Sequence, residues 1–338
     1  MGRGREGLRD GSGGSREDPA PGRFVVSTHL KFSGIMPANI LPFTADHAIH
    51  EADYRRHLRW LADARGVTGI VCNGHAAEVS SLTREERRRA FGIATEEVGA
   101  RQPLIAGVYA ENTHEAVLLA RDAQAEGASG LLLFPPTIFM WGGREHPEMV
   151  YRYVAAIAEA VPLPLVIFQY PPASGLGYTT EILVRLVEIP TVVAVKEWSN
   201  DIVTFERNLR AIRATGRPVA VLSSFTMSLL ASFLLGADGA ISGMGSVVAD
   251  FQAEMFAHVR QGDLEAARKI HDRLDPLVRV FYAPPFLDMH NRMKEALVVL
   301  GRIERAVVRP PLVPIGEAER SAIRAALVAT GFLPPVAA

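Results

Sequence analysis

Apolar residues fall in eight short runs along the chain, and amphipathic stretches separate the runs. Each run is nearly continuous in apolar character, with little alternation, as expected for strands that are buried on both faces of a parallel sheet. The pattern therefore predicts eight strands inside the protein. The runs begin at Gly34, Thr68, Pro103, Gly130, Pro164, Val192, Val219 and Gly239.

The amphipathic stretches carry the start and stop signals of helices. Thr83 followed by Glu86 has the spacing of a capping box, and Gly99 is a suitable C-cap for that helix. Asn112 and Asp201 are suitable N-caps for the helices after the third and sixth strands. Each strand is thus followed by a helix.

Eight strand–helix units with short connections predict an α/β fold of the (β/α)8 TIM-barrel class. A doubly wound open sheet is the alternative, but the first strand is not followed by a GxGxxG motif. Three further helical stretches come after the eighth strand, and a closed barrel does not need them. We therefore expect the barrel over residues 31–250, and the last barrel helix with a C-terminal helical extension over 251–338.

Residues 1–30 are expected to be a disordered tail, or a start assigned too far upstream. The first 23 residues are rich in glycine, arginine and aspartate, and they lack the apolar core of a signal peptide. The formal net charge of -1 gives no electrostatic reason for binding nucleic acid or a membrane, and no apolar run is long enough to span a bilayer. A single cysteine, Cys72, excludes an internal disulfide and fits a cytoplasmic protein.

The composition draws attention to one lysine. Of 36 basic residues only four are lysines, so the chain uses arginine wherever a positive charge suffices. Lys196 nevertheless ends the apolar sixth strand, where TIM barrels place their functional groups. Desolvation lowers the pKa of a lysine and yields a neutral amine that attacks ketones. The alternative is an ion pair with Glu197, but strand neighbours point to opposite faces.

The second strand ends in a small-residue segment that has a histidine. Gly74 and Ala76 leave backbone N–H groups open for a carboxylate, and His75 is a candidate acid/base. His75 and Glu78 could equally just satisfy backbone groups in a turn. A metal site is unfavoured, because no other histidine has a spacing that completes a ligand set.

Aromatic residues follow the fourth and fifth strands. Tyr170 is a candidate proton relay, or a packed aromatic with its hydroxyl at the rim. The run from Phe139 to Trp141 is either a pocket lid or a subunit contact. Phe139, Trp141 and Trp198 are also candidates for an apolar wall of the pocket.

At this point the sequence resembles the dihydrodipicolinate synthase and N-acetylneuraminate lyase superfamily, from about Gly34 to Leu333. The resemblance rests on several segments, which are Pro-Phe-Thr at 42–44, Gly-His-Ala-Ala-Glu at 74–78, Phe-Gln-Tyr-Pro at 168–171, Val-Lys-Glu at 195–197, Gly-Ala-Ile-Ser at 239–242, Met-Lys-Glu-Ala-Leu at 293–297 and Arg-Pro-Pro-Leu at 309–312.

The resemblance implies that Lys196 forms an imine with pyruvate or a longer 2-keto acid. Gly74, His75 and Ala76 would hold the keto-acid carboxylate, and Ile241 would line the same pocket. No metal or organic cofactor is implied, and a homotetramer or homodimer is expected. The function expected is a lyase or aldolase; the alternatives are a hydro-lyase of a 3-deoxy-2-keto sugar acid and a non-catalytic 2-keto acid binder.

Departures from the family pattern sharpen the expectation. Phe168 stands where the family has its relay tyrosine, and His75 stands at a cradle threonine of the same relay. We expect His75 to take over the proton transfer of the missing tyrosine. A second possibility is that the Tyr170 hydroxyl reaches back into the site and transfers the proton. A third is that His75 only binds the substrate carboxylate as a cation. Ala173 replaces the arginine that dihydrodipicolinate synthases use for a second carboxylate, so that particular activity is not expected.

Overall fold

The computed structural model describes residues 1–2 and 31–334 and confirms the predicted (β/α)8 barrel. The predicted tail, residues 1–30, falls outside the described residues except for its first two. The eight strands are β1 (Gly34–Pro37), β2 (Ile70–Cys72), β3 (Leu104–Val108), β4 (Gly130–Leu133), β5 (Leu165–Gln169), β6 (Val192–Glu197), β7 (Ala220–Ser223) and β8 (Gly239–Ser242).

All strand pairs are parallel, and β1 pairs with β8. Isolated parallel bridges, Ile35 with Val67 and Ala38 with Val71, bring β1 against the β2 segment and complete the ring. The approach of β8 to β1 needs a glycine, because a Cβ on Gly239 would lie 2.0 Å from the carbonyl oxygen of Gly34. The barrel is therefore closed.

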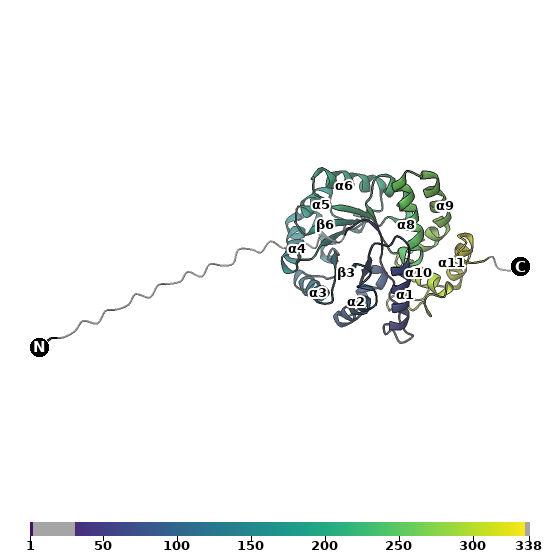
Figure 1. Ribbon diagram of the computed structural model, residues 1–338, viewed down its shortest axis with the longest axis horizontal. Helices are drawn as coiled ribbons and strands as arrows, with labels where there is room; N and C mark the ends of the chain where they lie inside the picture. Colours follow the sequence, from purple (N-terminus) through teal and green to yellow (C-terminus); the bar gives the residue numbers. More distant parts are fainter. Residues whose placement is uncertain (3–30, 335–338) are drawn as a thin grey trace.

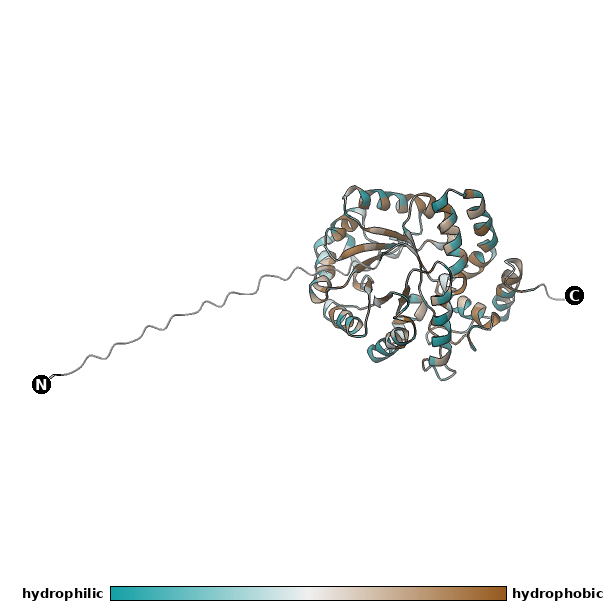
Figure 2. Ribbon diagram, in the orientation of Figure 1, coloured by the Kyte–Doolittle hydropathy of each residue, from teal (hydrophilic) through white to brown (hydrophobic). Residues whose placement is uncertain are grey.

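Helices surround the barrel. They are α1 (Glu51–Asp63), α2 (Arg84–Val98), α3 (Thr113–Ala125), α4 (Pro147–Ala160), α5 (Thr180–Val187), α6 (Ile202–Ala214), α7 (Leu229–Leu234) and α8 (Gly245–Gln261). Figure 1 shows them as a ring, and Figure 2 shows apolar strands inside it and helices whose outer faces are more hydrophilic. The core is the apolar layer between strands and helices.

The predicted caps are present. Thr83 and Glu86 form a capping box at the start of α2, and Gly99 follows its end with right-handed helical backbone angles. Asn112 and Asp201 accept hydrogen bonds from the first turns of α3 and α6. Local sequence signals therefore set the starts of these helices.

Three more helices follow the barrel, as predicted: α9 (Leu264–Phe281), α10 (Met289–Val299) and α11 (Glu317–Ala329). They contact one another, and α9 and α10 also contact α8 on one side of the barrel (Figure 1). Helix α8 crosses residue 250, where we placed the end of the barrel. The division of the chain into two units stays a prediction.

Candidate active site

A pocket of about 490 Å³ opens at the end of the barrel where the strands finish. Side chains from the ends of β2, β5 and β6 form one wall, including His75, Tyr170 and Lys196. The opposite wall comes from the C-terminal helical region and includes Tyr282 and His290. The C-terminal helical region thus completes the wall of a pocket that begins at the barrel mouth.

Lys196 lies at the bottom of this pocket with only 6% of its surface exposed. It pairs in register with Phe168 of β5, and its Nζ lies 3.9 Å from the centre of the Phe168 ring. Burial lowers the pKa of Lys196 to about 7. A large fraction of this amine is therefore neutral at neutral pH, which is the state that attacks a carbonyl carbon.

Glu197 points away from Lys196, as strand geometry predicts. Its carboxylate accepts hydrogen bonds from Ser199 and from the Asn208 side chain of α6. Burial raises the pKa of Glu197 to about 7. The ion pair considered for Lys196 is absent from the described part of the chain.

The structure brings together the two rival proton-transfer residues. His75, in the 3-10 helix η1 (His75–Ala77), has its Nε2 in a hydrogen bond with the Tyr170 hydroxyl. Tyr170 packs on Phe168 with ring centres 4.5 Å apart, so its side chain returns towards Lys196 rather than lying at the rim. The choice between His75 and Tyr170 posed by the sequence is therefore replaced by a bonded pair.

The charge state of His75 differs from what its residue type suggests. Burial, and then the charge of Lys196, lower the pKa of His75 to about 3. Burial also raises the pKa of Tyr170 well above its usual value. Both groups are therefore neutral at pH 7, which argues against a cationic, carboxylate-binding role for His75.

Of the four residues predicted to bind substrate, two line the pocket and two do not. Ala76 and Phe168 line the pocket. Gly74 precedes η1 and has open space where a Cβ would lie, but it does not line the cavity. Ile241 is fully buried in β8, opposite Met36, and does not line it either. Gly243, which directly follows β8, lines the pocket instead.

A buried ion pair beside the pocket was missed by the sequence reasoning. Glu78 binds the Nζ of Lys294, whose side chain is 0% exposed, and it also accepts the backbone N–H of Arg309. Burial lowers the pKa of Lys294 to about 8. Glu78 therefore joins the η1 segment to the C-terminal helices. The scarcity of lysine in the sequence is the signal by which Lys294 could have been singled out.

The aromatic residues after the fourth strand differ in their exposure to solvent. Phe139 is buried against Tyr153, and Trp141 is 82% exposed. Of the three aromatic residues suggested for the apolar wall, Trp198 lines the pocket. The rest of that wall is supplied by the C-terminal region, including Phe286 and Leu287, which sequence patterns did not single out.

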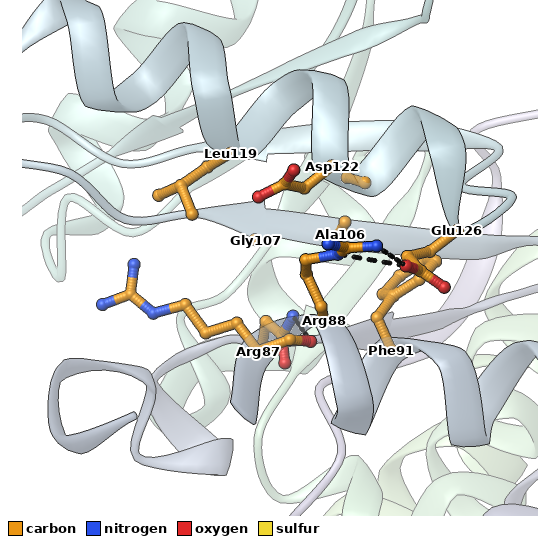
Figure 3. A pocket seen from close by; sticks show the side chains of 10 residues that line it. Arg87, Arg88, Phe91, Ala106, Gly107, Leu119, Asp122 and Glu126 are labelled. Atoms are coloured by element: carbon orange, nitrogen blue, oxygen red, sulfur yellow. Dashed lines mark hydrogen bonds and ion pairs between the residues drawn. The ribbon is translucent and has the colours of Figure 1, made fainter. Parts of the chain in front are cut away.

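A second, much smaller pocket lies outside the barrel between α2, β3 and α3 (Figure 3). It holds about 20 Å³, room for one water. Arg88 pairs with Glu126 across it. Neither its size nor its contents suggest a substrate site.

Residues 1–2 and 31–334 contain no group of three or more histidine, cysteine, aspartate or glutamate side chains that could hold a metal ion. Within the same residues, no helix combines the length and the apolar character that a membrane crossing requires.

A buried lysine at the mouth of a TIM barrel fits the class I lyases, enzymes that act through a Schiff base on a lysine. The comparisons with known proteins agree with this class. The chain belongs to the dihydrodipicolinate synthetase family, whose model matches residues 31–330.

The relatives cover most of the chain. The 4-hydroxy-tetrahydrodipicolinate synthase of Nitratidesulfovibrio vulgaris is 31% identical over 277 residues, which are 81% of this chain and 90% of the relative. The crystal structure of YagE, a prophage protein of E. coli K12 in complex with pyruvate, has a TM-score of 0.83 at 26% identity and covers 89% of this chain and 99% of its own. A monomeric dihydrodipicolinate synthase variant has a TM-score of 0.82 at 25% identity and covers 89% and 98%.

Proposed function

We propose that the chain forms or cleaves a carbon–carbon bond of a pyruvate-type 2-keto acid through an imine on Lys196. The observation that carries the proposal is the buried amine of Lys196 at the bottom of the pocket, whose pKa burial lowers to about 7. Family membership supports an imine at this position, and the structure of YagE with pyruvate supports the substrate class.

The pocket supplies groups for each step. The Lys196 amine attacks the keto carbon, and loss of water gives an iminium. The hydrogen-bonded pair of His75 and Tyr170 is then placed to move the proton at C3, which gives an enamine. The enamine carbon attacks the carbonyl of the second substrate. The first N–H groups of η1, near Gly74 and Ala76, are the proposed ligands of the keto-acid carboxylate.

We further propose that the second substrate is an uncharged aldehyde. Ala173 is exposed and carries no charge. Arg309, the arginine of the pocket wall, is occupied by Glu86 and by backbone carbonyls. No cation of the described wall except Lys196 is thus free for a second carboxylate. Apolar side chains such as Trp198 and Phe286 favour this aldolase reaction over dehydration of a polyhydroxylated sugar acid.

The proposal is tested by trapping the imine. The protein is incubated with pyruvate and borohydride, and its intact mass is measured. We expect one reduced pyruvate adduct on the wild type, none on Lys196→Ala, and a normal adduct on Lys269→Ala, whose lysine is exposed on α9. An adduct that persists on a folded Lys196→Ala protein would disprove the assignment of Lys196.

Assembly as a homotetramer or homodimer stays a prediction. Exposed apolar side chains in the 3-10 helix η3 (Thr137–Trp141), namely Ile138, Met140 and Trp141, are candidates for the subunit contact. One structural neighbour is a monomeric variant. Light scattering on the full chain distinguishes these states.

A further inference from the structure

His290 is a second histidine of the same pocket, and it comes from a different part of the fold than His75. It lies in the first turn of α10, in the C-terminal helical region, and lines the cavity together with Lys196 and His75. Its ring faces the end of β8, because a Cβ on Gly243 would lie 3.1 Å from the His290 Nε2. Glycine at position 243 therefore leaves the space that this ring occupies.

The other titratable side chains of the pocket already have protein partners. His75 and Tyr170 bind each other, and Glu78 binds Lys294. The Tyr282 hydroxyl donates to Thr226, and Arg309 pairs with Glu86.

His290 has no such partner. Neither of its ring nitrogens has a hydrogen bond or an ion pair with any residue in 31–334. Apart from Lys196, which the imine uses, His290 is therefore the titratable group of the described pocket wall that is free to meet a substrate.

The surroundings keep this imidazole neutral. Burial is the main reason that the pKa of His290 is lowered to about 3, and positive charge on the neighbouring lysines Lys196 and Lys294 acts in the same direction. A neutral imidazole has one nitrogen that accepts a proton and one N–H that donates a hydrogen bond. His290 is thus neutral and can both accept a hydrogen bond from a substrate hydroxyl and donate one to a substrate oxygen.

An aldol reaction needs proton transfer at two places. One is C3 of the keto acid, where the enamine forms, and the other is the oxygen on C4 that comes from the aldehyde. The His75–Tyr170 pair is assigned to C3. Its two members are bonded to each other, which leaves the C4 oxygen without an assigned group.

We propose that His290 is the catalytic acid/base at the C4 oxygen, a role that rests on the proposed aldolase function. In cleavage, the imidazole takes the proton of the C4 hydroxyl as the C3–C4 bond breaks. The electron pair of that bond goes to the Lys196 iminium and forms the enamine, and the aldehyde leaves. In condensation, the enamine attacks the aldehyde carbon and the N–H of the neutral imidazole gives its proton to the new alkoxide. The other ring nitrogen takes up a proton from water, which replaces the one released at C3.

The test separates the two proton transfers. Wild type, His290→Gln and His290→Ala are compared in three measurements: borohydride trapping of pyruvate, exchange of the pyruvate methyl protons in D2O, and condensation of pyruvate with propanal, benzaldehyde and glyceraldehyde. Trapping and exchange need no aldehyde. We expect both to stay within about twofold in the variants while kcat for condensation falls by ~10²–10⁴. His114→Gln, an exposed histidine of α3, is the matched control and should behave as wild type.

Each other outcome has a defined meaning. Condensation at wild-type rates in both variants overturns the role of His290, and so does an equal fall in exchange and condensation, which indicates a purely structural role. A wild type that traps pyruvate but condenses none of the three aldehydes also overturns it. A wild type that forms no pyruvate adduct instead refutes the proposed function itself.

Discussion

Replacing Lys196 by methionine should make the protein more stable, and the gain should depend on pH. The wild-type fold holds an amine whose pKa falls from its ordinary value of 10.5 to about 7, because burial removes water from the charged form. The folded state therefore binds fewer protons than the unfolded state between these two values. Wild-type stability should rise with pH across this window, and the cost of burying Lys196 is complete below it.

The size of the effect follows from the two pKa values. At about 1.4 kcal/mol per pKa unit, a fall from 10.5 to about 7 corresponds to roughly 4–5 kcal/mol. This cost applies in full at about pH 6 and falls to about 2 kcal/mol at about pH 9. Methionine also adds a constant packing contribution beside Phe168. That contribution cancels when the two pH values are compared.

The assay is urea unfolding of wild type and Lys196→Met at both pH values. We expect the stabilising effect of the substitution to shrink by about 2–3 kcal/mol from about pH 6 to about pH 9. His75 and His290, with pKa values of about 3, stay neutral in the folded state across this window. Their titration in the unfolded state is common to both proteins and cancels in the comparison. Lys269→Met, which removes an exposed lysine, should change stability by less than about 0.5 kcal/mol at either pH. An effect of Lys196→Met that is the same at both pH values would refute the desolvation of Lys196, and with it the neutral nucleophile.

Three further predictions follow from the contacts around the pocket. His75→Ala should lower kcat by ~10²–10⁴ while borohydride still traps pyruvate. Adding Tyr170→Phe to His75→Ala should lower kcat little further, because the pair acts as one unit; losses in kcat that add up would contradict the bonded relay. Glu78→Ala should lower the free energy of unfolding by about 3–5 kcal/mol, because it leaves a buried charge on Lys294, and adding Lys294→Met should recover most of that loss in urea unfolding. Aspartate semialdehyde should have a much lower kcat/KM than benzaldehyde in condensation with pyruvate, and efficient dihydrodipicolinate formation would contradict the uncharged acceptor.

The sequence by itself determined the barrel and the place of its lysine. Buried parallel strands leave continuous apolar runs, and helix starts leave caps such as Thr83 and Asn112, so both kinds of element are encoded locally. Once the barrel is predicted, the end of each strand is known to face the site. This is why Lys196 and His75 were found without coordinates, and why Glu197 was expected to point away.

Tertiary structure decided how these residues act. The pKa of His75 depends on burial by neighbours distant in sequence, and its bond to Tyr170 joins the ends of β2 and β5. His290 lies more than two hundred residues after His75, and neither hydrophobic periodicity nor capping near it indicates that α10 folds over the barrel mouth. Periodicity and capping report only on contacts within a few residues. Contacts between distant segments, which set charge states and complete the pocket, appear only when the chain is folded.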